Sequence, residues 1–386
     1  MAERTAIVAG GGIGGLTAGI ALMHRGWRVT VLERASDIAE VGAGIQLGPN
    51  AVTVLRRLGV DIAPAAFRPE ALEMRRGRSG RQVFRIAIDN IAEQRWGAPY
   101  LHIARFDLID ALVRRCGEMR IRTQAKVVAY QQDTDKVRVR LADGEELTGD
   151  ILIGADGIRS RIRRQILGED RPRFTGNVAW RILIPSARLG ELAPPPTACV
   201  WVGQGRHAVT YRVHGGLLTN LVAVVEHSSW RSESWTEQGT AAEALNDFRG
   251  WHPTITTIFE QADAHYRWAL YDREPLPIWT DGRVALLGDA CHPMLPFLAQ
   301  GASMAIEDAW VLADHLDREP NHRRALTEYA DTRRPRTTRV QSESRENASR
   351  FHHSELAYAP IQLAARIRPQ SFVRRFDWLY GHDVTA

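Results

Sequence analysis

The chain has 386 residues, of which 44% are hydrophobic and 25% charged, and its formal net charge is +5. This length predicts two closely packed domains rather than one. Basic and acidic residues are interleaved, without a block of five or six basic residues, so the charge does not favour a nucleic-acid-binding protein. No run of ~18 apolar residues is present and the start lacks a signal-peptide pattern, so we expect a cytoplasmic protein without membrane association.

The three cysteines are Cys116, Cys199 and Cys291, and their wide spacing matches neither a disulfide framework nor a zinc site. We expect them to be buried thiols in a reducing compartment. No metal site is predicted.

The N-terminal segment predicts a strand, a glycine turn and a helix. Residues 5–9 form a short apolar run, and residues 16–25 show the apolar spacing of a helix. Between them, Gly10, Gly12 and Gly15 satisfy the GxGxxG pattern: the first permits the turn, the second lets the backbone approach a pyrophosphate, and the third lets the helix pack on the strand. This arrangement predicts dinucleotide binding.

A second predicted strand, residues 27–32, ends at Glu33. An acid about twenty residues past the glycines is where a carboxylate accepts hydrogen bonds from an adenosine ribose. The regular strand and helix alternation of a dehydrogenase does not follow; instead Asn50 is predicted to cap a helix beginning near Ala51. The stretch before that helix is interrupted by Gly42, Gly44 and Gly48. A glycine-lined loop followed by a capped helix suits the close approach of a flat ring system.

Four stretches together carry a resemblance to a known family. They are the GxGxxG turn with Glu33, VGAGI at 41–45, ADGIRSRIR at 155–163 and GRVALLGDACHPMLPFLAQGASMAIEDA at 282–309. In this order, over residues 4–340, they resemble the single-component FAD-dependent aromatic hydroxylases, a family of flavoprotein monooxygenases. The similarity is greatest to the salicylate 1-hydroxylase, 3-hydroxybenzoate 6-hydroxylase and 6-hydroxynicotinate 3-monooxygenase branch.

The resemblance implies a mixed α/β fold with a glutathione-reductase-like Rossmann FAD-binding domain, an inserted antiparallel β-sheet substrate domain and C-terminal helices. We expect the FAD-binding domain in residues 1–72, 98–172 and 270–340, the substrate domain in 73–97 and 173–269, and the C-terminal helical segment in 341–386. The aromatic residues near the C-terminus are expected to dock back on the body.

The resemblance also implies the FAD ligands. These are Gly10, Gly12, Gly15, Glu33, Arg34, Gly44, Ile45, Arg105, Asp156, Gly157, Gly288, Asp289, Pro296, Gly301 and Ala302. The residues support two of these roles independently. Asp289 ends a predicted buried strand, 284–287, where a carboxylate can accept from a ribityl hydroxyl, and a helix beginning near Gly301 directs its N–H groups at the pyrimidine side of a flavin.

Two arginines near these motifs have two possible roles each, and one histidine is interpreted as structural. Arg159 and Arg163 lie on a predicted arginine-rich helix, which is either a solvated face or a partial site for the phosphates of the electron donor. His292 is interpreted as a structural loop histidine and not as a catalytic base.

Residues 171–270 change to a period of two, which predicts an antiparallel sheet. In RHAVTYRV, His207, Val209, Tyr211 and Val213 share one face, with His207 and Tyr211 about 13 Å apart along an ideal strand. The resemblance implies that His207 and Tyr211 contact the aromatic substrate, with His207 accepting the phenol proton at a pKa near its ordinary value. The alternative is a histidine and a tyrosine that merely pack.

The implied reaction uses NADH, or alternatively NADPH, as a transient electron donor to FAD, and O2 adds at flavin C4a to give a hydroperoxide that hydroxylates a phenolate. The expected substrate is a small hydroxylated aromatic such as salicylate or 3-hydroxybenzoate, and the expected state is a monomer or homodimer. Pro296 and Phe297 replace a polar residue found in some branches, so the position of the substrate's second polar group stays open. The alternatives are a larger aromatic or heteroaromatic substrate, a flavin-binding redox protein without hydroxylase activity, and a nicotinamide-dependent dehydrogenase.

Overall fold

The structure is a computed structural model that describes residues 3–38, 44–169, 172–227, 237–367 and 369–386. Gly42 and the first part of the predicted VGAGI loop lie outside the described residues.

A six-stranded sheet forms the centre of the dinucleotide-binding part. Its strands, in spatial order, are β17 (Thr280–Asp281), β18 (Val284–Leu286), β11 (Ile151–Gly154), β1 (Thr5–Ala9), β2 (Arg28–Leu32) and β7 (Arg120–Arg122). All neighbouring pairs are parallel except β17 with β18. Strands β1, β11 and β18 are apolar and buried throughout most of their length, as expected for parallel strands covered on both faces.

Two smaller antiparallel units flank this sheet. One contains β8 (Val127–Gln132), β9 (Val137–Leu141) and β10 (Glu146–Gly149), and the other pairs β3 (Gly44–Leu47) with β6 (Leu101–Ala104).

The second large sheet has seven strands. In spatial order they are β16 (Tyr266–Asp272), β12 (Arg173–Pro185), β15 (Leu218–Glu226), β14 (Arg206–Val213), β13 (Ala198–Gly203), β4 (Ala71–Arg76) and β5 (Gln82–Ala87). The predicted antiparallel pairing is confirmed for the strands within 171–270, but β13 pairs with β4 in parallel. The sequence period indicates strands but not which distant strand lies beside β13.

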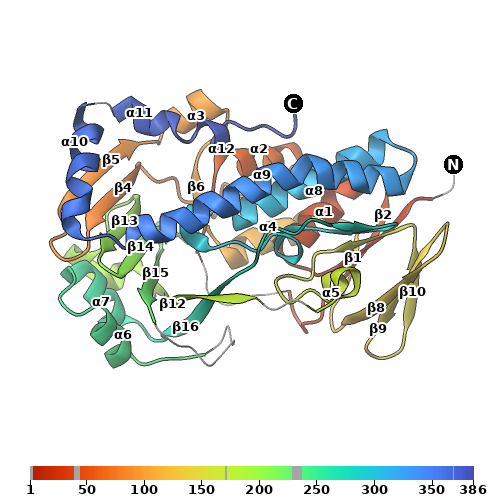
Figure 1. The fold of residues 1–386 in the computed structure, drawn as a ribbon, viewed down its shortest axis with the longest axis horizontal. Coiled ribbons are helices and arrows are strands. Elements are labelled where there is room, and N and C mark those ends of the chain that lie inside the picture. The colour runs from red at the N-terminus through yellow and green to blue at the C-terminus, as the bar shows by residue number, and fades with distance from the viewer. Residues whose placement is uncertain (1–2, 39–43, 170–171, 228–236, 368) are drawn as a thin grey trace.

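The helices surround both sheets, as Figure 1 shows. They are α1 (Ile13–Met23), α2 (Pro49–Arg57), α3 (Ile91–Trp96), α4 (Arg105–Arg115), α5 (Arg161–Leu167), α6 (Ala241–Asp247), α7 (Pro253–Gln261), α8 (Gly301–Arg318), α9 (His322–Phe351), α10 (Ala359–Ile367), α11 (Pro369–Arg374) and α12 (Asp377–Tyr380). Helices α8 and α9 pack against each other, and the 30-residue α9 extends from the dinucleotide-binding part to the seven-stranded sheet.

The predicted cap of α2 is wrong. The helix begins at Pro49 with Gly48 as its N-cap, and the Asn50 side chain instead donates to Gln300 Oε1 at 3.1 Å and to Glu307 Oε1 at 2.6 Å. Proline at the first helical position has no N–H group that would require a capping acceptor. The Asn50 side chain is therefore available to bind another helix.

The C-terminal segment docks back on the body, as predicted. Leu379 and Tyr380 are buried, and the Tyr380 ring lies edge-on to Trp96 and Tyr100 at centroid distances of 5.1 and 5.6 Å. Arg336 of α9 donates to the backbone oxygens of Trp378 and Leu379. These contacts tie the end of the chain to α3, to the residue before β6 and to α9.

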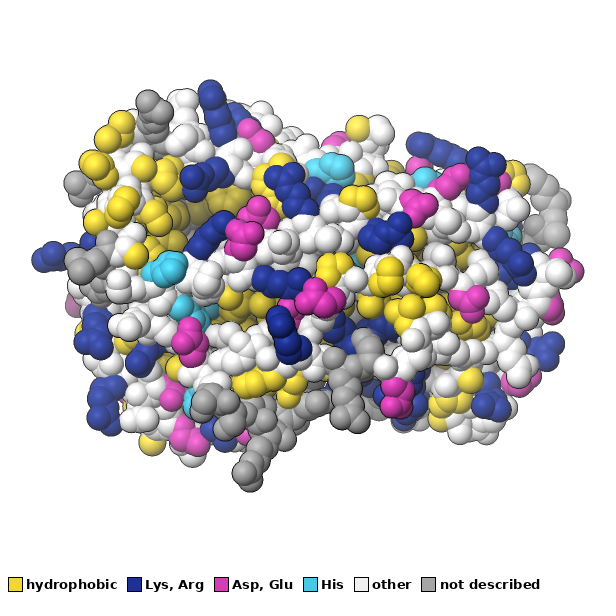
Figure 2. Space-filling view, in the orientation of Figure 1, with side chains coloured by type: hydrophobic (Ala, Val, Ile, Leu, Met, Phe, Trp, Pro, Cys, Tyr) yellow, Lys and Arg dark blue, Asp and Glu magenta, His cyan; other side chains and the backbone are white. Residues whose placement is uncertain are grey.

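The three cysteines are buried free thiols, as predicted. Basic and acidic side chains are interspersed on the face shown in Figure 2, so the basic charge is not gathered into one patch there. Within the described residues, no helix is both long and apolar enough to cross a bilayer.

Candidate active site

The glycine turn after β1 fits closely against the loop after β11. Gly10 has φ +112°, and a Cβ there would lie 2.2 Å from the Ala155 carbonyl oxygen. A Cβ on Gly15 would lie 1.9 Å from the Gly10 oxygen, so neither position accepts a side chain. Gly12 is the N-cap of α1, and no side chain hydrogen-bonds its first turn. The turn therefore leaves the first N–H groups of α1 uncapped, which is the arrangement that binds a pyrophosphate.

Glu33 and Arg105 border this turn from two sides. Glu33 ends β2, accepting from the Gly11 N–H at 2.8 Å and the Ala35 N–H at 2.9 Å. Arg105 is the first residue of α4, directly after β6, and a Cβ on Gly12 would lie 4.0 Å from its Nη2. The structure thus brings the predicted acid and the predicted arginine to the glycine turn, whereas the Arg34 side chain is exposed.

Asp156 lies in the loop after β11, with one carboxylate oxygen buried. Its Oδ2 accepts from the Arg161 N–H at 2.7 Å, but its buried Oδ1 has no hydrogen-bond partner among the described residues. Burial raises the pKa of this carboxyl group, although the backbone N–H groups favour the ionised form. Gly157 follows with φ +77° and open space where a Cβ would be. An orphaned buried carboxylate oxygen beside a glycine cradle fits the hydroxyl groups of an FAD, so the residues present suit this cofactor.

Arg163 is buried and is therefore not part of a solvated helix face. Its side chain is buried, with Nη1 donating to the Ala290 oxygen at 2.9 Å and Nη2 to the Ile158 oxygen at 2.7 Å. Arg163 thus connects the Asp156 loop to the loop after β18. The arginine-rich pattern did not indicate this role, because the partners of Arg163 are backbone oxygens, one of them in a distant segment.

The loop after β18 is hydrogen-bonded to α8. Gly288 has φ +62°, and its N–H donates to Asp308 Oδ2 at 3.1 Å. Asp289, the next residue, has an exposed side chain. This geometry directs the Asp289 carboxylate outward from the end of the parallel sheet, where a cofactor binds in such folds.

Helix α8 begins at Gly301, as predicted. Gln300 is its N-cap but makes no side-chain cap, and Ala299 before it has φ +52°. Pro296 opens a short 3₁₀ turn just upstream, and Gly301 and Ala302 are half-buried. The free N–H groups and positive dipole end of an 18-residue helix thus come directly after the loop that carries Asp289.

A buried ionic cluster supports this helix. Glu307 accepts from Arg333 Nη1 at 2.6 Å, and Asp308 accepts from Arg333 Nε at 2.7 Å. Glu307 also accepts from Arg336 at 2.7 Å, and His292 Nε2 donates to Asp308 Oδ2 at 2.5 Å. Burial opposes ionisation of both acids, but the neighbouring cations keep the pKa of each below its ordinary value.

One group in this cluster has the atom types of a metal site. Ligand atoms of Cys291, His292 and Asp308 lie within 4.8 Å of one another. Burial raises the pKa of the Cys291 thiol well above its ordinary value, and Asp308 is already bound by Arg333. A protonated thiol and a neutralised carboxylate are poor metal ligands, so the cluster is explained as an ion-pair network.

The predicted shared face of β14 is confirmed. His207 is 1% exposed, and its ring centroid lies 5.0 Å from that of Phe297, in the loop before α8. Tyr211 is 4% exposed and lies 4.9 Å from the His102 ring, near Gly44. The two residues therefore face the dinucleotide-binding part at two different places, one beside the loop before α8 and one beside β3 and β6.

The expected ordinary pKa of His207 is wrong. Burial, and secondarily the His352 ring, hold the pKa of His207 well below its ordinary value. Burial also raises the pKa of Tyr211, so both groups are neutral at neutral pH.

Four polar residues near these two were missed by sequence reasoning. His207 Nδ1 lies 2.8 Å from His352 Nε2, and His352 Nδ1 lies 2.7 Å from Glu226 Oε1. Beside Tyr211, Asn220 Oδ1 accepts from the Gly44 N–H at 2.8 Å, and buried His102 contacts the tyrosine ring. Sequence separations of 145 and 126 residues within the histidine chain explain why no local pattern indicated it.

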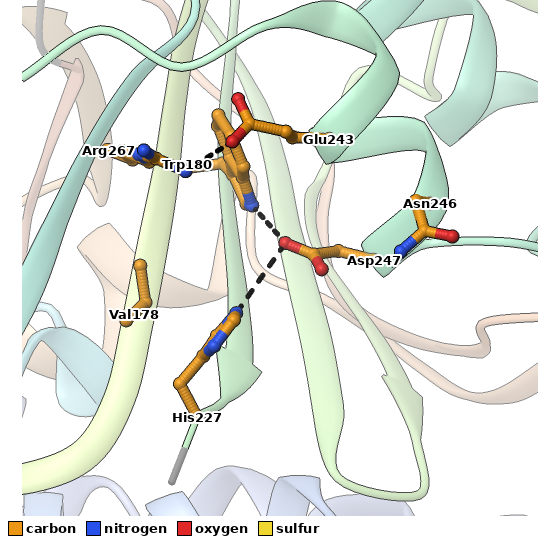
Figure 3. A pocket seen from close by; sticks show the side chains of 7 residues that line it. All are labelled: Val178, Trp180, His227, Glu243, Asn246, Asp247 and Arg267. Atoms are coloured by element: carbon orange, nitrogen blue, oxygen red, sulfur yellow. Dashed lines mark hydrogen bonds and ion pairs between the residues drawn. The ribbon is translucent and has the colours of Figure 1, made fainter. Parts of the chain in front are cut away.

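The pocket in Figure 3 lies on the opposite face of the seven-stranded sheet. Its volume is about 140 Å³. It is lined by Val178, Trp180, His227, Glu243, Asn246, Asp247 and Arg267. Trp180 donates to Asp247 at 2.8 Å and belongs to the core beneath α6 and α7, whereas the neighbouring Ala179 belongs to the core with Phe297. The pocket is therefore separated by the sheet from His207.

Comparison with known proteins identifies the family. The FAD binding domain family matches residues 3–344. A 3-amino-4-hydroxybenzoate 2-monooxygenase of Streptomyces platensis is 38% identical over 391 residues, covering 99% of this chain and 96% of that protein. The 3-hydroxybenzoate 6-hydroxylase 1 of Aquipseudomonas alcaligenes is 37% identical over 385 residues, covering 98% of each. A solved salicylate hydroxylase substrate complex has a TM-score of 0.81 at 28% identity, covering 99% of this chain and 96% of that one.

Fold and site together define a flavoprotein of the FAD-binding class. The chain belongs to the FAD-dependent aromatic hydroxylases, the family that its motifs resemble, and FAD is its cofactor.

Proposed function

We propose that this chain hydroxylates a small phenolic carboxylic acid, with a hydroxybenzoate or an amino-substituted hydroxybenzoate as the substrate class, using O2 and NAD(P)H. The observation that carries this proposal is the buried, neutral His207 on the sheet face that meets the loop before α8. The names of the relatives, which include a 3-amino-4-hydroxybenzoate 2-monooxygenase and a 3-hydroxybenzoate 6-hydroxylase, support the choice of substrate class.

His207 is assigned as the base that removes the phenolic proton. Its Nδ1 is engaged by His352, and its Nε2 has no hydrogen-bond partner among the described residues. A phenolate is a better carbon nucleophile than a phenol, so a base within reach of the hydroxyl accelerates oxygen insertion. Because the ring is buried and neutral, its Nε2 is available as an acceptor over the whole neutral pH range.

Tyr211 is assigned to position the ring and its second polar group. It stays protonated, and its hydroxyl has no hydrogen-bond partner among the described residues. The loop at Pro296 and Phe297 offers apolar contact, so polar recognition falls to the sheet side, where Asn220 also has a buried Nδ2 without a partner among the described residues. Donor groups of this kind suit a carboxylate.

The FAD-binding residues of this proposal lie around the glycine turn and the loops at the strand ends. Gly10, Gly12, Gly15, Glu33 and Arg105 surround the glycine turn, and Asp156, Gly157, Gly288 and Asp289 border the two loops at the strand ends. Arg34, Gly44, Ile45, Pro296, Gly301 and Ala302 complete the proposed set. When bound and reduced, FAD supplies the activation of O2. The protein positions it and excludes water from the reacting atoms.

The test is oxygen consumption by the purified yellow protein with NADH or NADPH. The panel is salicylate, 3-hydroxybenzoate, 4-hydroxybenzoate, 3-amino-4-hydroxybenzoate and 6-hydroxynicotinate, with products and carbon dioxide identified. We expect one benzoate to stimulate oxygen uptake with stoichiometric hydroxylated product. Release of carbon dioxide would mark a decarboxylating hydroxylation. Oxygen uptake without any hydroxylated product across the panel would contradict the proposal and favour a flavin redox protein.

A further inference from the structure

The polar contacts of His207 continue beyond the sheet face to the molecular surface. His207 Nδ1 is 2.8 Å from His352 Nε2, and His352 Nδ1 is 2.7 Å from Glu226 Oε1. The exposed fractions of the side chains are 6% for His352 and 60% for Glu226. Three side chains from β14, the end of α9 and the end of β15 thus join a buried ring to solvent.

The geometry at the outer end is fixed by the backbone. The Gly205 N–H, in the turn between β13 and β14, donates to the His352 oxygen at 3.2 Å. The Glu226 N–H donates to the Gly205 oxygen at 3.0 Å. The last turn of α9 is therefore anchored on the hairpin that carries His207, which holds the backbones that bear the two imidazoles side by side.

The exposed carboxylate determines the protonation of both rings. Glu226 can only accept, so His352 carries its proton on Nδ1. The Nε2 of the neutral His352 ring is then an acceptor, and His207 must donate to it from Nδ1. The consequence is that the Nε2 of His207 holds a lone pair, which is the form that a base needs.

We propose that His352 and Glu226 form, with His207, a proton-transfer chain that carries the phenolic proton of the substrate to solvent. This inference rests on the proposed function of His207 as the base. The His207 ring faces the His352 ring and the aromatic rings of Phe297 and Phe351. His352 also faces the Glu226 carboxylate, and the exposed His353 follows it in the chain.

The steps balance one proton in and one proton out. The substrate O–H breaks as His207 Nε2 gains the proton, and the His207 Nδ1 proton moves to His352 Nε2. The His352 Nδ1 proton then moves to Glu226, which releases it to water. Reprotonation of the product along the same chain in the reverse direction restores both tautomers.

A proton-transfer chain avoids a lasting positive charge on the buried His207 ring. Burial holds the pKa of His207 well below its ordinary value, so a lasting imidazolium at this position is unfavourable. Passing the proton on leaves His207 neutral and places the charge change at an exposed carboxylate, where water stabilises it.

The first test reads the tautomers directly and needs no substrate. In the FAD-loaded protein labelled with ¹⁵N-histidine, we expect both His207 and His352 to be protonated at Nδ1 and unprotonated at Nε2. The two residues are assigned from the signals lost in His207→Gln and His352→Gln. A His207 ring protonated at Nε2 would overturn the proposal, whatever the substrate proves to be.

The second test measures proton release on ligand binding. FAD-loaded protein is mixed anaerobically with 3-hydroxybenzoate in weak buffer containing a pH indicator. We expect Glu226→Gln and His352→Gln to slow proton release at least tenfold, with the dissociation constant changed less than twofold. The matched control is His353→Gln, which removes the adjacent exposed histidine and should leave the rate within twofold of wild type. Equal rates in all four proteins would overturn the chain.

A rescue experiment separates proton transfer from anchoring of α9. Because Glu226 is 60% exposed, a small carboxylate can reach the cavity that Glu226→Ala leaves. We expect added formate to restore the proton-release rate of Glu226→Ala in a concentration-dependent manner, and a lack of rescue would contradict the chain. If wild-type protein binds 3-hydroxybenzoate without releasing a proton, the proposed base function fails, and the tautomer measurement alone decides the chain.

Discussion

Two buried histidines of this protein, His292 and His207, are each 1% exposed but have partners of different kinds. His292 Nε2 donates to Asp308, whose carboxylate is also bound by the buried Arg333. His207 Nδ1 binds a second histidine, His352, which leads to an exposed glutamate.

The partner of a buried histidine determines what that histidine does. A histidine bound to a fixed internal carboxylate is held in one tautomer and orders the loop on which it lies. A histidine bound to another neutral imidazole can exchange its proton without creating a buried charge. His292 therefore stabilises the loop after β18, whereas His207 is suited to move a proton.

The largest effect is expected from breaking the cluster around His292. Arg333→Met leaves Glu307 and Asp308 buried with less compensating charge, and uncompensated buried charges destabilise a protein by about 3–5 kcal/mol. We expect a corresponding loss in the free energy of unfolding, measured by urea denaturation of the FAD-loaded protein, together with weaker flavin retention. The reason for the second effect is that Asp308 also holds the Gly288 N–H.

The control for this change is the adjacent arginine. Arg334 pairs with Asp331 at 2.7 Å and its side chain is 36% exposed, so Arg334→Ala should change the free energy of unfolding by no more than about 1 kcal/mol. Equal destabilisation by the two substitutions would show that the buried cluster stabilises the protein no more than the exposed ion pair of Arg334 does.

The next effect tests the other histidine. We expect His207→Ala to lose at least about 100-fold in the rate of product formation while retaining FAD, because general base catalysis contributes roughly 10²–10⁴-fold. Product yield is measured by chromatography and FAD by absorbance. His214→Gln, directly after the same strand, is the control, since His214 pairs with Asp107 rather than facing His207. Unchanged product yield in His207→Ala would refute its assignment as the base.

Much of the dinucleotide-binding part, which contains His292, is predictable from sequence. The strand, turn and helix around Gly10 follow from glycine spacing and apolar runs, and the start of α8 at Gly301 follows from the loop motif. These features are local, so nearby residues determine them. The buried role of Arg163 was not predictable, because a short helix with three arginines gives no sign of which one meets a distant carbonyl oxygen.

The surroundings of His207 in the seven-stranded sheet are predictable only in part. The alternation in β14 places His207 and Tyr211 on one face, but it says nothing of their partners. His352 lies at the end of a helix whose preceding 30 residues give no indication of where that end meets the sheet. The depressed pKa of His207 likewise depends on burial, which a period-two pattern does not quantify.

A smaller, more local effect is expected at the loop that His292 stabilises. Asp289→Ala should purify with less than about one tenth of the wild-type FAD, since the carboxylate at the end of the parallel strands is the proposed acceptor for the cofactor's hydroxyl groups. The measurement is the ratio of flavin to protein absorbance after gel filtration. Asp263→Ala, at an exposed ion pair with Arg188, is the control. A fully loaded Asp289→Ala protein would contradict the assignment.

The smallest effect concerns a third buried histidine, which has neither kind of partner. His102 is 0% exposed, and neither of its ring nitrogens has a hydrogen bond of good geometry to a residue that the structure describes. The backbone of Arg212 offsets only part of the effect of burial on its pKa. Burial lowers the pKa of His102 to about 3. Between this value and its ordinary pKa of about 6.5, the unfolded chain binds a proton that the folded protein does not, so stability falls as the pH falls.

At pH 5.5, one unit below the ordinary value, this difference amounts to about 1.4 kcal/mol. His102→Phe removes the titrating group and keeps a ring against Tyr211. We expect the free energy of unfolding to fall less between pH 7.5 and 5.5 in His102→Phe than in wild type, by about that amount. The exposed His353, replaced by glutamine, should leave the pH slope unchanged. Parallel slopes for wild type and His102→Phe would mean that His102 gains a proton in the folded protein, and that a buried histidine without a carboxylate or imidazole partner can nevertheless hold a charge here.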